Sequence, residues 1–484
     1  MNRFLLFFLL IPIIGISQIQ IGDKIEGDHG TDVFGGSVAM SADGNIIAVG
    51  ATHNDNNGSN AGHVRVYENS NGTWTQIGDD IEGEAAGDVL GQSVALSAVG
   101  NIIAVGAPYN SGGGTNSGHV RVSENVDGNW TQIGDAINGD NQFDKCGWSV
   151  DLSADGNIVA IGSWEGNGNG NNSGQVRVFE NINGVWTQIG SDIYGLQPEH
   201  GLGVSVALSS DGTILATGAN EHPSSMGDSD YTMIFENVSG EWVQIGEAIY
   251  GDYNLSGDSV SLSADGNIVA IGTLNGGGDL QGFVRVYENI AGTWAQIGSD
   301  ILGEHPLDQS GKVSLSADGT ILAVGAPSSH LGGNIAGQVR IYKNVSNTWV
   351  QIGSDIDGED TSDYFGGSVA LSNEGTKLIV GAVTSITSTT KKGYVKVYDL
   401  TDALSTDNFA KPNFNIYPNP AKDIIHIALE DDLQLENVII YNNLGQEVKT
   451  VNQSTIDVSS LAKGLYFIEV HTNQGKASKK VVVE

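Results

Sequence analysis

The sequence predicts an all-β fold, and two repeated patterns support this prediction. The stretch FGGSVAMSADGNIIAVG at residues 34–50 returns six more times in altered form, starting at residues 90, 146, 202, 256, 310 and 365. A second pattern, Gln-Ile-Gly, starts at residues 20, 76, 132, 188, 244, 296 and 351, so the period is 52 to 56 residues. Repeats of this length that contain only short strands and turns are typical of β-propellers with four strands per blade.

Each repeat supplies four candidate strands in a fixed order. In the first repeat they lie at residues 37–41, 45–50, 64–69 and 74–78, where apolar and polar residues alternate. The turn Asp43-Gly44-Asn45 separates the first two strands, and its residue types tolerate positive φ angles. We therefore expect a seven-bladed β-propeller of four-stranded antiparallel blades.

The two ends of the repeat array predict how the ring closes. Six of the fourth strands begin with a tryptophan, at residues 74, 130, 186, 242, 294 and 349, a spacing that predicts packing between blades. The seventh repeat stops at Tyr398 without such a strand, and the missing strand is present at residues 18–22. We expect this N-terminal strand to complete the seventh blade, and we assign residues 18–402 to the propeller.

The lengths of the connections divide the predicted ring into two faces. Turns between the first and second strands, and between the third and fourth, are short and uniform, and we call their side the turn face. Connections between the second and third strands are long and varied, as at residues 51–62 and 107–118. They share the opposite side, the loop face, with the connections from one repeat to the next. Because variable loops on a rigid scaffold carry recognition, we expect the loop face to bind ligands.

The Phe-Gly-x-Ser-Val pattern is accompanied in two repeats by Val-Gly-Ala-Pro, at residues 105–108 and 324–327. These motifs resemble the FG-GAP repeats of integrin α-subunit propellers, over residues 18–400. Many members of that family hold calcium in a D-x-[DN]-x-[DN]-G-x-x-D loop between the first two strands. Here that connection is only Asp43-Gly44-Asn45, too few oxygens for the roughly six to eight ligands of calcium. We expect no cofactor at these turns, and calcium binding by the variable loops stays open.

The C-terminal part of the chain has a different composition. After a linker at residues 403–412, residues 413–484 alternate between short strands and Asn-rich turns, which predicts a small immunoglobulin-like β-sandwich. The motifs YPNP (417–420), NLGQ (443–446) and GLYFI (464–468), with the pair Lys479-Lys480, resemble the type A C-terminal sorting domain of the bacterial type IX secretion system. The resemblance implies contact between residues 413–484 and the secretion machinery. It also implies passage across the outer membrane, removal of the domain, and release or attachment to surface lipopolysaccharide.

The N-terminal residues 1–17 have the pattern of a secretory signal peptide. Arg3 precedes an apolar run that ends in Gly15-Ile16-Ser17, so we expect cleavage before Gln18. No later stretch is long enough for a membrane span. We therefore expect a monomer that is extracellular or on the outer-membrane surface of a bacterium. The one cysteine, Cys146, occupies the repeat position of Phe34 and Leu90, which predicts a core residue.

The chain is strongly acidic, with a net charge of −36 from 57 acidic and 21 basic residues. This balance excludes nucleic acid as a partner, because phosphate binding needs a basic surface. Acids recur in the connections between repeats, and we name seven of them the acidic collar: Asp28, Asp32, Asp88, Asp140, Asp144, Asp308 and Asp363. Such recurrence favours bonds to backbone amides of the same blade. The alternative is a collar that binds a divalent cation or a cationic ligand.

Residues that are not repeated are the candidates for ligand specificity. His53, Tyr109, Trp164 and His222 follow the second strands of four repeats and lie on the predicted loop face. Trp164 stands in the Gly/Asn-rich stretch SWEGNGNGNNSG, where its ring could stack on a sugar or on a partner side chain. The alternative for Trp164 is local packing.

No motif for a catalytic nucleophile, a zinc site or a phosphate-binding loop occurs in the sequence. We therefore predict a binding or adhesion protein that recognises a glycan or an extracellular protein through the loop face. Two alternatives stay open: a polysaccharide-acting hydrolase or lyase with acids at the centre of the ring, and a structural component of the surface or matrix.

Overall fold

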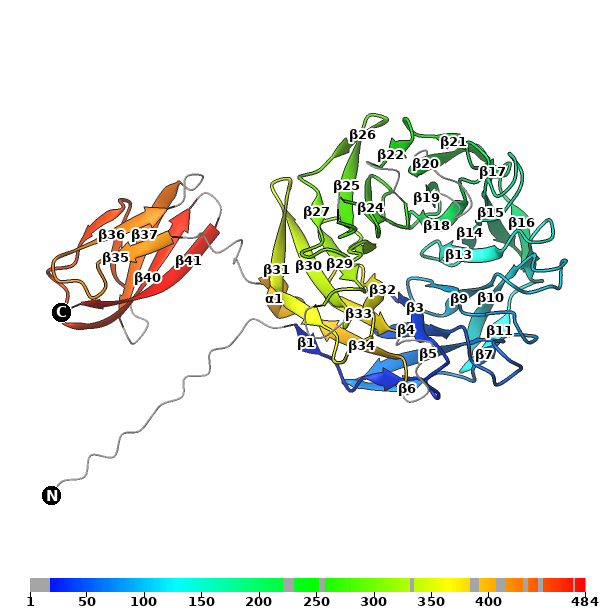
Figure 1. The fold of residues 1–484 in the computed structure, drawn as a ribbon, viewed down its shortest axis with the longest axis horizontal. Helices are drawn as coiled ribbons and strands as arrows, with labels where there is room; N and C mark the ends of the chain where they lie inside the picture. The colour runs from blue at the N-terminus through cyan, green and yellow to red at the C-terminus, as the bar shows by residue number, and fades with distance from the viewer. Residues whose placement is uncertain are drawn as a thin grey trace, which may run out of the picture.

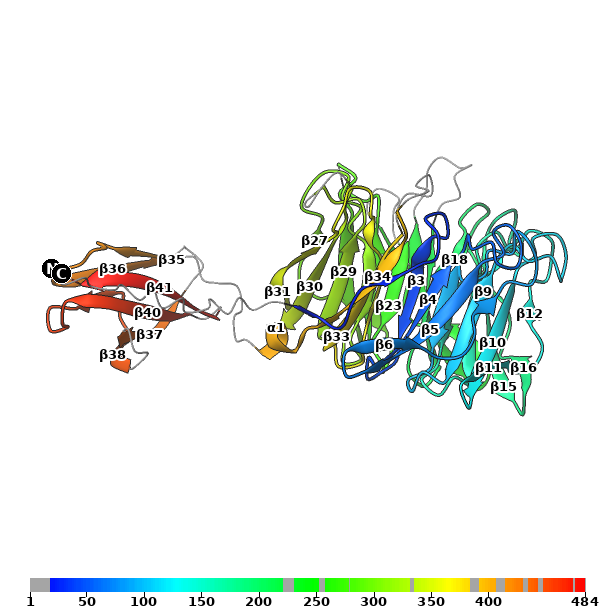
Figure 2. The same cartoon turned by 90° about the horizontal axis from the view of Figure 1, so that it is seen from below.

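The computed structural model describes residues 18–220, 230–251, 257–277, 279–330, 335–383, 391–405, 414–429, 434–442, 447–472 and 475–483. These residues form an all-β structure, as predicted, with α1 (Thr401–Ser405) as the one helix among them. Figure 1 shows antiparallel sheets arranged in a ring, and in Figure 2 their strands run between the two faces of that ring. The predicted signal peptide at residues 1–17 and most of the predicted linker lie outside the described residues.

Within the described residues, strands β1–β34 form seven sheets, each with a path of four strands from the centre outward. The first sheet contains β3 (Phe34–Met40), β4 (Ile46–Ala51), β5 (His63–Ser70), β6 (Thr73–Gln76) and β7 (Ile81–Glu82). The second contains β8 (Ser93–Leu96), β9 (Ile102–Ala107), β10 (His119–Val126), β11 (Asn129–Gln132) and β12 (Ile137–Asn138). The third contains β13 (Cys146–Leu152), β14 (Ile158–Ser163), β15 (Gln175–Ile182), β16 (Val185–Gln188) and β17 (Ile193–Tyr194).

The next three sheets repeat this order. The fourth contains β18 (Leu202–Leu208), β19 (Ile214–Ala219), β20 (Tyr231–Val238), β21 (Glu241–Gln244) and β22 (Ile249–Tyr250). The fifth contains β23 (Ser259–Leu262), β24 (Ile268–Thr273), β25 (Phe283–Ile290), β26 (Thr293–Gln296) and β27 (Ile301–Leu302). The sixth contains β28 (Lys312–Leu315), β29 (Ile321–Ala326), β30 (Gln338–Val345) and β31 (Thr348–Asp357).

In the first five sheets the predicted fourth strand is followed by a second short segment, outside the predicted range, that pairs with the same third strand. In the first sheet, β6 and β7 both pair with β5, and the chain between them passes through Gly78, whose φ is +72°. Only glycine adopts such an angle without strain. A Cβ on Gly78 would also lie 2.7 Å from the carbonyl oxygen of Gly128 in the next repeat. The Gly of Gln-Ile-Gly is therefore required by the kink and by the close approach of the neighbouring sheet.

The last sheet of the ring joins the two ends of the array. It contains β32 (Phe365–Leu371), β33 (Lys377–Ala382) and β34 (Tyr394–Asp399), together with β1 (Ile19–Gln20) and β2 (Ile25–Glu26). Ile19 pairs with Asp399 and Ile25 with Val395, so both N-terminal strands lie along the outer edge of β34. Figure 1 shows β1 beside β34 where the blue and yellow ends of the ring meet.

The Phe-Gly motif marks a β-bulge at the start of the innermost strand. Phe34 is fully buried and pairs with Ala51, and the register then shifts before Ser37. Gly35 has a φ of +87°, and a Cβ there would lie 2.9 Å from the Tyr394 carbonyl oxygen. The bulge thus buries the phenylalanine and turns the following residues toward the ring centre.

The apolar core lies between neighbouring sheets. One cluster joins Val64 and Val66 of β5 to Leu90, which precedes β8, and to Ile103 and Val105 of β9. An equivalent cluster packs Phe34, Ile47 and Val49 of the first sheet against residues of β33 and β34. Because the first and last sheets share a core, the hydrophobic effect stabilises ring closure in the same way as every other contact between sheets.

Two hydrogen-bonded rings connect the inner parts of the sheets. On the turn face, main-chain N–H groups donate to the next carbonyl in a closed circuit: Ala42 to Ala98, Ala154, Ser210, Ala264, Ala317, Asn373 and back to Ala42. On the inner strands, serine Oγ atoms donate to glycine carbonyls of the next sheet at 2.7–2.9 Å, and we call these the serine ring: Ser37, Ser93, Ser149, Ser205 and Ser368.

The C-terminal part forms two further antiparallel sheets. One contains β35 (Phe414–Tyr417), β36 (Ile424–Leu429) and β39 (Thr455–Asp457). The other contains β37 (Leu435–Asn442), β38 (Glu447–Val451), β40 (Gly464–Thr472) and β41 (Gly475–Val483). Alternate residues of both sheets, among them Ile425, Ile440 and Ile468, form a shared buried cluster, so this part has its own core.

Candidate functional site

The turn face is built from a repeated local hydrogen-bond pattern. Asp43 accepts hydrogen bonds from Ser41 Oγ at 2.7 Å and from Asn45 N at 2.9 Å. The pattern recurs at Asp155, Asp211, Asp265 and Asp318. Aspartates that bond their own turn in this way fix the turn geometry. These carboxylates are therefore engaged in holding the chain, which agrees with the short connection of the sequence.

The buried acids of the collar hold the loop face together. Asp88 is 3% exposed and accepts hydrogen bonds from Ala85 N, from Glu84 N and, at 2.9 Å, from Asn110 Nδ2 of the next long loop. In four other repeats, the aspartate carboxylate likewise accepts a hydrogen bond from the main-chain N–H of the residue three positions before it: Asp32, Asp144, Asp308 and Asp363. Each of these aspartates thus closes its own connection. Burial raises the pKa of Asp144, whose Oδ1 has no hydrogen-bond partner in the structure.

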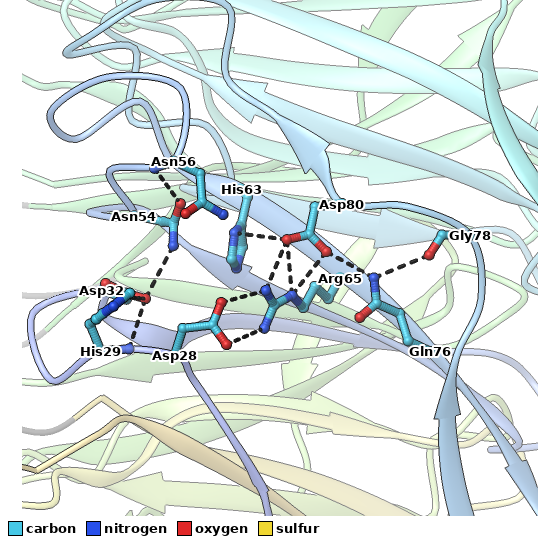
Figure 3. Close-up of polar contacts among 10 residues, drawn as sticks. All are labelled: Asp28, His29, Asp32, Asn54, Asn56, His63, Arg65, Gln76, Gly78 and Asp80. Atoms are coloured by element: carbon cyan, nitrogen blue, oxygen red, sulfur yellow. Dashed lines mark hydrogen bonds and ion pairs between the residues drawn. The ribbon is translucent and has the colours of Figure 1, made fainter.

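The two exposed collar acids pair with arginines of the third strands. Figure 3 shows Asp28 facing Arg65 of β5, with Asp80 on the other side of the guanidinium. The hydrogen bond from Arg65 lowers the pKa of Asp28. Asp80 also lies 3.4 Å from the ring of His63, which is buried, and burial lowers the pKa of that imidazole. The cluster joins the connection before the first sheet to the middle of that sheet.

Equivalent ion pairs surround the ring. Asp140 lies 2.7 Å from Arg177 Nη1, and Glu359 lies 2.7 Å from Lys396 Nζ. Looser pairs join Glu84 to Arg121 and Glu304 to Arg340. Among the described residues, no group of three or more histidine, cysteine or acidic side chains could hold a metal ion. These contacts favour a structural role for the collar, and cation binding by it stays a prediction.

Aromatic and charged side chains gather on the loop face between the second and third sheets. The rings of Trp148 and Trp164 have centroids 4.8 Å apart, and the ammonium of Lys145 lies 3.9 Å from the centre of the Tyr109 ring. Burial raises the pKa of Tyr109, and the charge of nearby Glu165 adds to this shift. Burial lowers the pKa of Lys145, and the charge of Glu165 opposes this shift without reversing it. We call these five residues the mouth cluster.

The mouth cluster borders a channel along the axis of the ring. The channel encloses about 230 Å³ and is lined by the inner strands of all seven sheets. Most of its wall is Ser, Val and Gly, and the larger or charged side chains in it are Gln92, Trp148, Asp258 and Lys312. Trp148 thus belongs to both the mouth cluster and the channel wall.

Other grooves, outside the channel, lie at the rim of the ring between neighbouring sheets. Cavities of about 450, 260 and 250 Å³ are lined by Trp186, Trp130 and Trp242 respectively. Each of these indoles donates a hydrogen bond from Nε1 to an isoleucine carbonyl of the preceding repeat, at 2.9–3.1 Å. The repeated tryptophans therefore join neighbouring sheets.

The structure brings together two of the four predicted ligand-binding residues. Tyr109 and Trp164 both belong to the mouth cluster. His53 lies in the first long loop, where its Nδ1 is 2.9 Å from Thr52 Oγ1. His222 lies outside the described residues. Ligand binding by any of the four stays a prediction.

Sequence reasoning missed Lys145, Trp148 and Lys312. A signal for them exists in the repeat itself, because each departs from its equivalents. Trp148 stands where the first repeat has Gly36, and Lys312 pairs with Gly325 as Ser37 pairs with Gly50. Comparison of each repeat position, rather than of the long loops alone, would have found all three.

Known proteins share parts of this chain. Residues 27–67 match the FG-GAP repeat family, and residues 415–484 match the secretion system C-terminal sorting domain. None of the curated proteins matches the sequence. Among solved structures, hydrazine synthase from Kuenenia stuttgartiensis is similar with a TM-score of 0.50 and 14% identity, over 78% of this chain and 98% of that chain. A candidate 6-phosphogluconolactonase from Bacteroides uniformis has a TM-score of 0.47 and 14% identity, over 67% of this chain and 86% of that one. The likeness concerns the fold alone.

The fold and these matches define an exported protein with a β-propeller-like ring of antiparallel sheets. The chain carries an FG-GAP repeat and a type IX C-terminal sorting domain, which directs it through the type IX secretion system to the cell surface or the extracellular space. In the described part of the chain, no helix combines the length and the apolar character that a membrane crossing requires.

Proposed function

We propose that this chain is a secreted or cell-surface binding protein that recognises a glycan or an extracellular protein on its loop face. The observation that carries the proposal is the mouth cluster, where two tryptophans and a lysine–tyrosine pair meet beside the channel on that face. Half-buried aromatic rings beside hydrogen-bonding groups suit both sugar rings and protein side chains.

We also propose the finer architecture on which this function depends. The seven sheets act as seven blades of a propeller at residues 18–402, and residues 413–484 form an immunoglobulin-like β-sandwich used for sorting. The closed circuit of main-chain hydrogen bonds on the turn face supports the first assignment. A rigid ring of this kind keeps the loop face in one arrangement, which lowers the entropy cost of binding.

Glycan-array binding and pull-down from the native cell surface, with the mature chain, test the proposal. Trp148→Ala and Trp164→Ala should each weaken binding about tenfold, since a stacked aromatic contact is worth roughly 1 kcal/mol or more. Tyr250→Ala is the matched control, because Tyr250 is 52% exposed on β22, away from the mouth cluster. Unchanged thermal unfolding would show that the tryptophan variants fold.

Two results would contradict the proposal. Binding that survives both tryptophan replacements would remove the mouth cluster from the site. Turnover of a surface polysaccharide, without stable binding, would assign the chain to a class of enzymes instead.

A further inference from the structure

Two of the seven inner strands interrupt the serine ring, and one of the two carries a lysine. At the equivalent position of the sixth sheet, Lys312 replaces the serine and pairs with Gly325 just as Ser37 pairs with Gly50. This copy of the repeat is also shorter, with 16 residues at 310–325 against 17 at 34–50. Its inner strand has no bulge and begins at Lys312 itself. A cation therefore stands where the other repeats place a hydroxyl.

The ammonium of Lys312 has no acceptor among the residues that the structure describes. Its side chain lines the channel, and among the described residues it takes part in no hydrogen bond or ion pair. Asp258 shares the channel, but its two oxygens already accept hydrogen bonds from Asn220 Nδ2 and Leu274 N. Burial lowers the pKa of Lys312, and the negative charge of Asp258 opposes this shift. A lysine has three donors and no acceptor, so this ammonium is available to an anionic group that enters the channel.

A second donor lies beside the lysine. Ser259 Oγ accepts a hydrogen bond from Val313 N, the residue after Lys312, at 3.2 Å. Within the described chain that hydroxyl donates to no acceptor, unlike the members of the serine ring. Ser259 also lines the channel. An ammonium and a hydroxyl group thus line the same solvent-open channel.

We propose that the channel binds one monovalent anionic group between Lys312 Nζ and Ser259 Oγ. The single positive charge of Lys312 suits a group with a single negative charge. The carboxylate of Asp258 in the same channel wall disfavours a second negative charge. The group is a halide-sized ion or a carboxylate, either free in solution or carried by a ligand that enters at the loop face. The site does not depend on the mouth cluster, so its test is independent of the proposed function.

Bromide and D-glucuronate serve as probes on crystals of the mature chain. The wild type should show an anomalous bromide peak within hydrogen-bond distance of Lys312 Nζ. Lys312→Ser, which restores the residue of the other repeats, should lose the peak and keep its fold, as checked by thermal unfolding. Lys422→Ser, the same change at an exposed lysine of the sorting domain, should keep the peak.

The second probe distinguishes the source of the anionic group. A glucuronate carboxylate at Lys312 would assign the site to acidic ligands, and bromide without glucuronate would assign it to free anions; both outcomes support the site. Absence of any anion beside Lys312 in the wild type, or a peak that persists in Lys312→Ser, would overturn the proposal.

Discussion

At the scale of single residues, the position of a side chain in the repeat decides whether it stabilises the fold or lines a candidate site. The aspartates of the collar show the scaffold role, because their oxygens bond the backbone of their own connection. Recurrence in the sequence predicted this possibility for Asp32 and Asp88. The alternation of strand side chains does not predict that Trp148 lines the channel, because a β-bulge between Cys146 and Ser149 interrupts it. Only comparison of the repeats marks this position as a departure.

The replacement Asp88→Ala should destabilise the protein by about 2 to 3 kcal/mol, because it leaves two main-chain N–H groups and the Asn110 amide without their acceptor. Thermal and urea unfolding measure the effect. Asp79→Ala is the control, since Asp79 is exposed in the same region of the chain. Equal stability of the two variants would show that the buried carboxylate does not hold the loop.

At the scale of elements, the sequence predicted the strands better than their junctions. The alternation of residues 45–50 and 64–69 agrees with β4 and β5. The second segment after the fourth strand, β7, was not predicted, because it depends on the contact of Gly78 with the next sheet. The inner strands also differ: β13 carries Asp151 where the first, second, fourth and seventh sheets have alanine.

Asp151 should make stability depend on pH. Burial raises its pKa to about 6, above the ordinary 3.8, although N–H groups of Leu208 and Leu152 donate to it. A folded-state pKa above the unfolded value contributes stability below pH 4 that is lost as the pH rises through about 6. The free energy of unfolding of Asp151→Ala, relative to that of the wild type, should therefore rise between pH 4 and pH 7 by up to roughly 3 kcal/mol.

Unfolding by urea at pH 4 and pH 7 measures this difference, since only the change between the two pH values reports the titration. Ala207→Ser is the control, because it alters the equivalent position of the fourth sheet without adding a titrating group. A pH-independent difference between Asp151→Ala and the wild type would show that the carboxyl titrates normally.

At the scale of the whole molecule, the ring depends on contacts between residues more than 300 positions apart. Ser368 Oγ donates to the Gly35 carbonyl at 2.8 Å, and Ile21 and Ile25 pack on the cluster shared by the first and last sheets. The absence of a tryptophan strand after Tyr398 predicted where the N-terminus would pair. The mouth cluster could not be predicted at this scale, because its members come from two neighbouring repeats whose mutual position only the closed ring defines.

Removal of residues 18–26 from the mature chain should open the ring at β34. The deletion exposes the edge of that strand and removes the apolar contacts of Ile21 and Ile25, so we expect the melting temperature to fall by about 5–10 °C. An open edge also favours pairing with a second chain, which size-exclusion chromatography would detect as concentration-dependent association.

A chain in which a Gly/Ser segment of equal length replaces residues 18–26 is the control for length. It should behave like the deletion, because the strand pairing and not the presence of a tail closes the ring. Wild-type melting and a monomeric profile for both variants would mean that the remaining sheets hold the ring closed without the N-terminal strands.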